Sequence, residues 1–238
     1  MAISELFGGE GVPEILAQGT PVGGIDVRSA NNIVAQQWQA IVEGYQRLEH
    51  PTKAQLDAVV AHAKELLVAL DNAAMAEPDK YVQNTLIYNN CIAIVDSVED
   101  LDCYEQKEDE WKRVSFPVSS SDLKIAGQKD SWEDKRDRHQ AQIEQEYLSS
   151  HETDAALLAE LRGEAAKIEA ELDELKAEKK SKGFFNFSEK GEVKERMKPV
   201  KKRLSDVEDQ IGEVEDRIED YVEERIAELG TSFVILDF

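Results

Sequence analysis

The chain has 238 residues, 41% apolar and 33% charged, a composition typical of one or two folded helical domains rather than of a disordered chain. Its formal net charge of −22 argues against general binding to the phosphates of DNA or RNA, and against contact of most of its surface with an anionic membrane. The same acidic excess suits cationic partners, divalent ions or a high-salt setting.

The N-terminal sequence and the cysteines bear on location. The first seven residues lack the basic region and long apolar core of a signal peptide, and no run approaches the ~18 apolar residues that span a bilayer. Cys91 and Cys103 are twelve residues apart, which matches neither a disulfide framework nor a zinc site. The sequence therefore predicts reduced cysteines and a cytoplasmic location, with no signal peptide and no transmembrane segment.

Residues 1–28 are predicted to form a flexible arm. Residues 8–24 hold six of the thirteen glycines together with Pro13 and Pro21, so this stretch is costly to order and has little to bury. A strap that becomes ordered on a neighbouring molecule is the alternative. The glycines at 8–11 are not followed by the Lys and Ser or Thr of a phosphate-binding loop.

Residues 29–113 are predicted to form a small bundle of amphipathic helices, whose apolar faces are wide enough to pack on two neighbours. Trp38 and Tyr45 lie on the apolar face of the first helix and are interpreted as core residues. Thr52 and Gln55 form a capping box at the start of the second helix. The predicted helices cover residues 29–50, 52–71, 78–101 and, for a short charged fourth helix, 102–113.

Residues 114–130 are predicted to be a connector that contains a strand, because residues 114–118 alternate apolar and small polar side chains. A second strand is predicted over residues 231–238, which are dense in β-branched and aromatic side chains. Since an apolar strand needs a partner, we expect 231–237 to pair with 114–118 and to close the base of a hairpin against the bundle. The residues of this pairing strand are Phe233, Val234, Ile235 and Leu236.

Residues 131–230 are predicted to form a projecting antiparallel coiled-coil hairpin with its tip at residues 182–191. Ser131 and Asp134 cap the first arm. In both arms apolar residues recur at spacings of 3 and 4, a heptad pattern that buries one narrow stripe against a partner helix. These residues, the seam, are Leu158, Leu161, Ala165, Ile168, Leu172 and Leu175 in the outgoing arm and Val193, Met197, Val200, Leu204, Val207, Ile211, Val214, Ile218 and Tyr221 in the returning arm.

Two residues interrupt the heptad pattern. Asp154 falls on the seam, where a charge costs stability and often marks a register lock or a contact outside the hairpin. Pro199 removes a backbone donor and clashes with the carbonyl of Glu195 in a straight helix. We therefore expect either a kink at residues 195–199 or a new helix with Pro199 in its first turn.

The tip differs from the rest of the chain in charge. Residues 176–203 contain eleven basic and four acidic residues, a net charge of +7, which leaves −29 for the remainder. The candidate interaction residues are Lys179, Lys180, Lys182, Phe184, Phe185, Phe187, Lys190 and Lys194. Phenylalanines flanked by lysines suit self-association with the acidic body of another copy, a phospholipid surface or nucleic acid. Alternatively, they fold back onto the end of the seam.

Signatures of catalysis or of a bound cofactor are not found in the sequence. The histidines, His50, His62, His139 and His151, have neither metalloprotease nor di-iron spacing. Neither cysteine has a base beside it in sequence, and no nucleophile elbow or kinase motif is present. We therefore predict no catalytic residues, no metal ligands, no cofactor and no enzyme activity.

The sequence favours a non-enzymatic structural or adaptor protein that mediates assembly through the hairpin and its basic, aromatic tip. The expected partners are proteins, including further copies in a homo-oligomer, and candidate settings include a phage virion or a multiprotein bacterial complex. The first alternative is a membrane-engaging protein with the logic of an α-helical cytolysin. The second is an acidic nucleic-acid mimic that acts as an inhibitor, based on the carboxylates of both arms.

Overall fold

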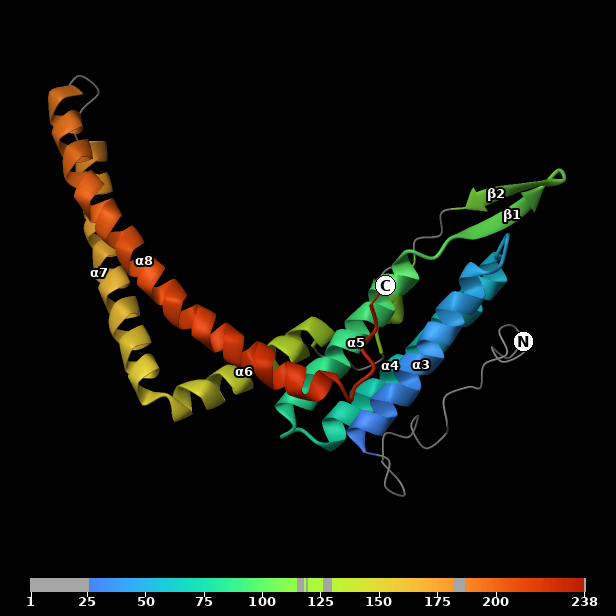
Figure 1. Ribbon diagram of the computed structural model, residues 1–238. Helices are drawn as coiled ribbons and strands as arrows, with labels where there is room; N and C mark the ends of the chain where they lie inside the picture. Colours follow the sequence, from blue (N-terminus) through green and yellow to red (C-terminus); the bar gives the residue numbers. More distant parts are fainter. Residues whose placement is uncertain (1–25, 115–117, 119, 126–129, 182–186, 238) are drawn as a thin grey trace. The chain divides into compact units, whose positions relative to one another are not determined.

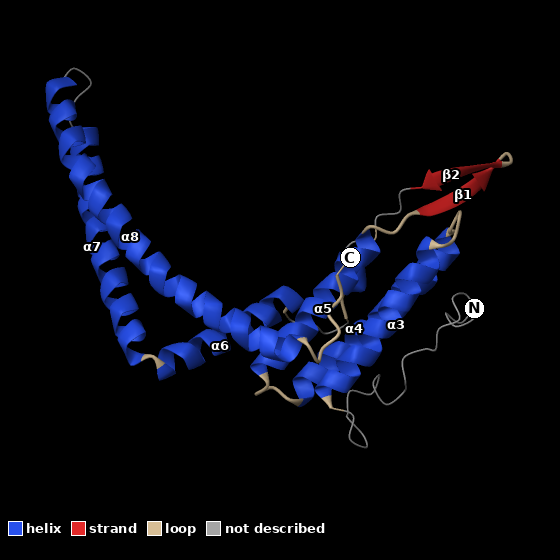
Figure 2. Cartoon of the chain, in the orientation of Figure 1, coloured by secondary structure: helices blue, strands red, loops and turns tan. Residues whose placement is uncertain are grey.

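The computed structural model describes residues 26–114, 118, 120–125, 130–181 and 187–237 (Figure 1). The described chain is mainly α-helical and contains a small antiparallel sheet of two strands (Figure 2), which confirms the predicted all-α class. It divides into two compact units: unit 1 contains the residues up to Ile143 and those from Glu224 onward, and unit 2 contains Glu144–Glu223. The predicted arm at residues 1–28 lies almost wholly outside the described residues.

The bundle of unit 1 is formed by α3 (Val27–Gln46), α4 (Lys53–Ala76) and α5 (Tyr81–Glu99). Asp26 caps α3 by accepting a hydrogen bond of 2.8 Å from Ser29 N, so this helix begins two residues before its predicted start. The predicted capping box of α4 is confirmed, since Thr52 N donates to Gln55 Oε1 at 2.8 Å. α4 also continues five residues beyond its predicted end.

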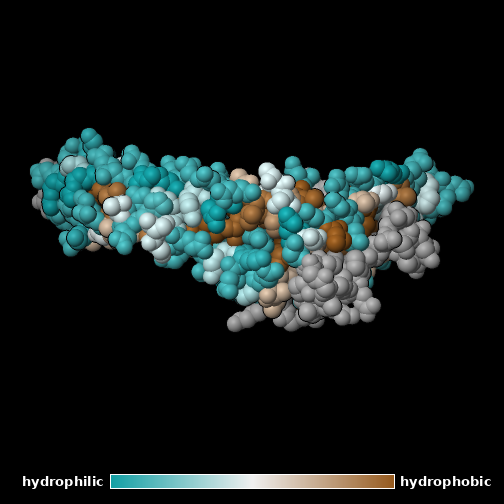
Figure 3. Space-filling view, turned by 60° about the horizontal axis from the view of Figure 1, so that its bottom comes forward, coloured by the Kyte–Doolittle hydropathy of each residue, from teal (hydrophilic) through white to brown (hydrophobic). Residues whose placement is uncertain are grey.

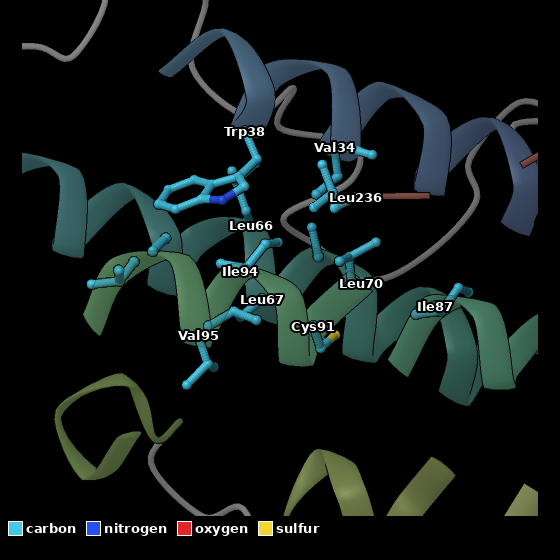
Figure 4. Packing of buried hydrophobic residues seen from close by; sticks show 14 of the residues in the cluster. Val34, Trp38, Leu66, Leu67, Leu70, Ile87, Cys91, Ile94, Val95 and Leu236 are labelled. Atoms are coloured by element: carbon cyan, nitrogen blue, oxygen red, sulfur yellow. The ribbon is translucent and has the colours of Figure 1, made fainter. Parts of the chain in front are cut away.

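The core of unit 1 lies between these helices (Figure 4). Trp38 is fully buried, as predicted, and its indole Nε1 donates to Ser97 Oγ at 2.9 Å. Tyr45 is also buried, and its hydroxyl donates to the carbonyl oxygen of Asp102 at 2.7 Å. Both aromatic side chains therefore pack in the core with their polar atoms bonded, as buried Trp and Tyr usually do.

The predicted fourth helix over residues 102–113 is wrong. This stretch forms a β-hairpin of β1 (Cys103–Lys107) and β2 (Glu110–Val114), in which Cys103 lies opposite Val114 and Lys107 lies opposite Glu110. The two turn residues, Glu108 and Asp109, have φ angles of 50° and 67°. This is the left-handed conformation that both residues of a tight hairpin turn adopt when its twist matches that of the strands.

Contacts with the loop between α3 and α4 explain why residues 102–113 do not form a helix. Tyr104 N donates to the carbonyl oxygen of Pro51 at 2.7 Å. The ring of His50 stacks on Trp111 with centroids 5.1 Å apart and lies 5.2 Å from the ring of Tyr104. Because these partners are distant in sequence, the local charge pattern that suggested a helix did not reveal them.

The predicted connector contains a short 3-10 helix, η1 (Ser120–Leu123). Leu123 is fully buried and belongs to the bundle core, and Val118 and Ile125 pack against that core as well. The connector is therefore anchored to unit 1 by apolar contacts. The part of the predicted strand at residues 115–117 lies outside the described residues.

The helix α6 (Trp132–Ser150) follows the connector. Its predicted cap is confirmed, because Ser131 N donates to Asp134 Oδ2 and Asp134 N donates to Ser131 Oγ, both at 3.1 Å. Trp132 is buried in the core of unit 1. Lys135 lies with its Nζ 2.5 Å from Asp71 Oδ1, and both side chains are only 14% exposed, so this ion pair helps to hold α6 on α4.

The predicted pairing of residues 231–237 with 114–118 is not formed. Val114 pairs with Cys103 instead, and residues 231–237 contain no strand. They are nevertheless held on unit 1, since Phe233 and Leu236 are buried in its core, where Figure 4 shows Leu236 among side chains of the bundle. Asparagine side chains of α3 and α5 replace the missing strand partner.

Unit 2 is a helical hairpin, in which α7 (Glu152–Ser181) is followed by α8 (Phe187–Gly230). Ion pairs join the two helices in antiparallel order. As the residue numbers of the partners in α7 increase, those of their partners in α8 decrease. These pairs are Asp154–Arg217, Arg162–Glu215, Glu171–Arg203 and Glu178–Arg196. The predicted antiparallel arrangement of the two arms is therefore confirmed.

The arms differ from the prediction in their continuity. The outgoing arm is broken at His151, between α6 and α7, which the sequence did not indicate. The returning arm is a single helix through Pro199, so the predicted new helix start there is wrong. Met197 and Val200 are both buried on the seam, and their burial offsets the ~3 kcal/mol that a proline costs inside a helix. The kink at residues 195–199 stays a prediction.

Candidate protein-interaction site

The seam joins α7 to α8 as predicted. Its residues form one apolar cluster in unit 2, in which Ala165, Leu204, Ile211 and Tyr221 are half-buried and the others are buried. Most other residues of these two helices are exposed and many are charged. On the face that Figure 3 shows, hydrophilic residues accordingly cover most of the surface and hydrophobic residues form limited patches.

A polar cluster lies where α6, α7 and α8 meet in unit 2. Tyr147 of α6 donates its hydroxyl proton to Asp154 Oδ2 at 2.6 Å. Arg217 of α8 binds both carboxylate oxygens of Asp154, with Nη2 2.9 Å from Oδ1 and Nε 3.3 Å from Oδ2. His151, at the break between α6 and α7, stacks on Tyr147 with centroids 4.0 Å apart. Tyr221 packs on the same ring at 5.2 Å.

These contacts stabilise the charged form of Asp154. Hydrogen bonds from Arg217 and Tyr147 lower the pKa of Asp154 to about 2, and the bond to Asp154 raises the pKa of the Tyr147 hydroxyl. Asp154 is the seam residue for which the sequence left a register lock and an outside contact open. Its partners lie within the hairpin, which favours the register lock, because Arg217 fixes the position of α8 against α7.

The basic residues of the predicted tip flank the turn between the two helices. Lys179 and Lys180 lie in the last turn of α7, and Lys190 and Lys194 lie near the start of α8. Lys180 and Lys194 are exposed, whereas Lys179 and Lys190 are half-buried. The structure therefore brings these four lysines to the same end of the hairpin.

Phe187 and Arg196 of α8 belong to the described part of the predicted tip. Lys182, Phe184 and Phe185 lie outside the described residues, and Phe187 is the first residue of α8. Arg196 Nη1 lies 3.0 Å from Glu178 Oε2, which joins the adjoining turns of α7 and α8. Whether the phenylalanines cover the end of the seam or face a partner stays a prediction.

A groove along α7 was not predicted from the sequence. It is a hollow of about 460 Å³, here called the α7 groove, whose lining includes Ala159, Glu160, Gly163, Glu164, Glu171 and Arg203. An added Cβ at Gly163 would meet no atom within 4 Å, so the groove is open above this residue. The signal in the sequence is a second stripe of small residues beside the seam: Ala159, Gly163, Ala166 and Ala170.

The α7 groove continues toward the basic end of the hairpin. A neighbouring hollow of about 330 Å³ shares Glu171 and Arg203 with it and extends to Arg196 and Pro199. The first hollow has three carboxylates and two basic side chains, Lys167 and Arg203, on its lining, whereas the second has one carboxylate and two arginines. The charge along this strip therefore changes from acidic to basic along the hairpin.

The predicted C-terminal pairing residues are bound through their main chain. Asn32 Nδ2 donates to the carbonyl oxygen of Ser232 at 2.9 Å, and Val234 N donates to Asn32 Oδ1 at 2.7 Å. Asn90 makes the same pair of contacts one step further along, since its Nδ2 donates to Val234 O at 2.8 Å and its Oδ1 accepts from Leu236 N at 2.9 Å. Each amide side chain thus binds the segment as the peptide group of a neighbouring strand would.

A third asparagine connects these two contacts. Asn31 Nδ2 donates to Val234 O at 3.1 Å, and Asn31 Oδ1 accepts from Asn90 Nδ2 at 2.8 Å. Asn31 and Asn90 are fully buried. The segment 232–236 is therefore held by a continuous hydrogen-bonded network beside the apolar core.

The surroundings of the two cysteines disfavour the reactive thiolate form. Cys91 and Cys103 are both buried and unpaired, and burial raises the pKa of each thiol. Since the thiolate is the reactive form, neither thiol is activated. Within the described ranges, no three His, Cys, Asp or Glu side chains are arranged to hold a metal ion.

Comparison with protein-family models, with curated proteins and with solved structures found no match to this chain. In the part of the chain that the structure describes, none of the helices combines the length and the apolar character needed to cross a membrane. The candidate site therefore rests on the geometry and charge of the hairpin and on the asparagine contacts of unit 1.

The sequence contains a signal for the asparagine contacts. Asn31, Val34 and Trp38 follow one another at spacings of 3 and 4, and Asn90 follows Ile87 at a spacing of 3. Both amides thus fall on faces that are otherwise apolar. A polar side chain at such a position needs a buried hydrogen-bond partner, but the sequence alone did not show that this partner is the backbone of residues 232–236.

Proposed function

We propose that this chain is a non-enzymatic structural or adaptor protein that assembles with other proteins, including copies of itself, through the coiled-coil hairpin of unit 2. The separation of charge along the hairpin carries this proposal. Residues 176–203 have a net charge of +7, whereas residues 205–228 contain eleven acidic residues and two arginines. Most of these charged side chains are exposed and available to a second molecule.

A second copy in the opposite direction is complementary to the hairpin. In that arrangement the basic end of each copy meets the acidic part of the α7 groove of the other, where Glu160 and Glu164 line the hollow. The small side chains of Ala159 and Gly163 leave room there for side chains of another helix. Charges of opposite sign guide such a contact and fix its direction.

The proposal is tested by sedimentation at low and high salt. Exposed charges are screened beyond about 3 Å at 1 M salt but only beyond about 30 Å at 0.01 M, so we expect oligomers at low salt that dissociate at high salt. Substituting Lys194, Lys201 and Lys202 with Gln should weaken self-association about tenfold, because three exposed ion pairs contribute about 0.5 kcal/mol each. The matched control replaces Lys64, Lys112 and Lys124, exposed lysines of unit 1, with Gln and should leave self-association unchanged.

A steric pair of variants tests the groove itself. Gly163→Gln places a bulky neutral side chain in the α7 groove, whereas Gly212→Gln places the same side chain on α8. An added Cβ meets no atom within 4 Å at either position, so both variants should fold. Only Gly163→Gln should reduce the low-salt oligomer, and equal oligomers from both variants would exclude the groove as the contact.

The alternatives give different outcomes in the same experiment. A chain that stays monomeric at low salt but co-sediments with anionic vesicles would contradict assembly and support a membrane-engaging tip. Serine substitutions of Phe184, Phe185 and Phe187 should then abolish vesicle binding. A monomer that instead competes with DNA for a basic DNA-binding protein would support the acidic mimic.

A further inference from the structure

The asparagine site of unit 1, formed by Asn31, Asn32 and Asn90, recognises a peptide backbone. It makes five hydrogen bonds to four main-chain groups, Ser232 O, Val234 N, Val234 O and Leu236 N, which span a segment of five residues. None of these contacts involves a side chain of the bound segment. The site therefore accepts other residues at positions where the side chain points away from the core.

Two positions of the segment add selectivity for apolar side chains. Phe233 and Leu236 are buried in the core of unit 1, whereas Val234 is half-buried and Ile235 is 43% exposed. The site thus selects an extended peptide with apolar residues at its second and fifth positions, counted from Ser232. Peptides that bind through their main chain combine affinity from backbone hydrogen bonds with selection by side-chain pockets in this way.

The site requires a hydrogen-bonding occupant. Asn31 and Asn90 are fully buried while the segment is bound, and removal of the segment would leave the main-chain contacts of both amides unmade. Buried polar groups without partners are strongly disfavoured. An empty site therefore favours capture of any peptide that restores these hydrogen bonds.

We propose that the asparagine site is a peptide-binding site that also accepts residues 232–236 of a second copy of this chain, in exchange for its own. The second copy is the occupant because its segment carries the same backbone groups and the same apolar residues that the site binds within one chain. The link to α8 is short and turns at Ser232, whose N donates to Leu229 O at 2.9 Å. A change of backbone angles at Gly230 and Thr231 is enough to redirect the segment to a neighbour, as in domain swapping.

The peptide-binding step is tested with an acceptor variant of the full chain. The substitutions Phe233→Ser and Leu236→Ser weaken binding of the chain's own segment to the asparagine site. A fluorescent peptide of residues 231–238 is then titrated against this acceptor variant. We expect saturable binding with a Kd on the order of 10 µM, read by fluorescence anisotropy. Adding Asn90→Ala to the acceptor should weaken binding at least tenfold. If the acceptor fails to fold, the unmodified chain is warmed with the peptide to near its unfolding transition, cooled and measured in the same way.

Peptide variants distinguish recognition of the backbone from non-specific hydrophobic binding. Methylation of the backbone nitrogens of Val234 and Leu236 removes the donors to Asn32 and Asn90 and should abolish binding. Changing Val234 to Thr and Ile235 to Ser leaves these donors in place and should alter the Kd by no more than about threefold. Equal binding of the methylated and unmodified peptides, or no binding of the unmodified peptide, would overturn the assignment of a peptide site.

The identity of the occupant is tested by mixing two full-length variants. The acceptor carries Phe233→Ser and Leu236→Ser, and the donor carries Asn32→Ala and Asn90→Ala with an intact C-terminal segment. Neither should form this contact alone, whereas an equimolar mixture should give a 1:1 heterodimer in native mass spectrometry. If the peptide binds but no heterodimer forms, a second copy is not the occupant.

Exchange of the segment does not depend on the charge contact of the hairpin. Hydrogen bonds and apolar burial in the core are little screened by salt, so the heterodimer should persist at about 0.5 M salt, where the hairpin contact dissociates. The substitutions of Lys194, Lys201 and Lys202 should leave the heterodimer intact. The two proposals can therefore fail separately.

Discussion

Asp154 is the residue whose ionisation the structure links most directly to folding. Arg217 and Tyr147 both bind its carboxylate, and the folded-state pKa of about 2 lies below the ordinary value of about 3.9. A carboxyl group with a lowered pKa stabilises the fold above its unfolded pKa. Its contribution is therefore fully present above about pH 5 and is lost as the pH falls from about 4 to about 2.

The variant Asp154→Asn should lower the melting temperature by a few degrees at pH 7, because the amide keeps the shape but loses the charge that Arg217 binds. The difference from the unmodified chain should shrink as the pH falls from about 4 to about 2. Circular dichroism melts at several pH values measure this difference. Asp206→Asn removes an exposed carboxylate from α8 and should show no such convergence. A difference for Asp154→Asn that stays constant down to pH 2 would contradict the role of its ionisation.

The β1–β2 hairpin is the element in which local sequence and observed structure conflict most. Glu108 and Asp109 both have positive φ. This conformation costs Glu108 roughly 1–2 kcal/mol, whereas an aspartate such as Asp109 tolerates it better. Contacts of Tyr104 and Trp111 with the loop between α3 and α4 offset this cost. The hairpin therefore forms because of contacts made elsewhere, although the residues of its turn do not favour the turn conformation.

The double substitution Glu108→Asn and Asp109→Gly should raise the free energy of unfolding by about 1 kcal/mol. Asn followed by Gly adopts the left-handed conformation of a two-residue hairpin turn readily, so the strain is relieved without altering the strands. Urea denaturation followed by circular dichroism checks this gain. The opposite change, Asp109→Val, should destabilise the chain, since a β-branched residue tolerates positive φ poorly. Equal stability of all three proteins would show that the turn is not strained.

The features predicted correctly are those that depend on neighbouring residues. The capping boxes of Thr52 with Gln55 and of Ser131 with Asp134 lie within one helical turn, and the seam is a repeat that can be read directly along each arm. The break at His151 was missed because Tyr147 bonds to Asp154 across it, and Asp154 in turn is bound by Arg217 on the returning helix. Local pattern alone does not encode such a contact.

At the scale of the whole molecule, contacts between residues far apart in sequence decide the features that prediction missed. The pairing of residues 231–237 with 114–118 was a reasonable expectation, because an apolar segment dense in β-branched residues needs a hydrogen-bonding partner. The requirement of residues 231–237 for a hydrogen-bonding partner was predicted correctly, but the identity of this partner was not. Asn32 and Asn90 satisfy it from helices that are about 200 and 145 residues away in sequence.

Deleting residues 231–238 should therefore destabilise unit 1. The deletion exposes the core surface that Phe233 and Leu236 cover and removes the main-chain groups that Asn31 and Asn90 bind. The lost burial of two such side chains and the lost hydrogen bonds destabilise the fold, whereas the entropy gained because the segment is no longer ordered partly offsets this loss. We therefore expect a decrease of about 2–4 kcal/mol in the free energy of unfolding. Differential scanning calorimetry should show a lower melting temperature. Ile235→Ser, at a largely exposed position, should change stability by less than about 0.5 kcal/mol. An unchanged transition for the deletion would mean that the segment adds no stability within its own chain.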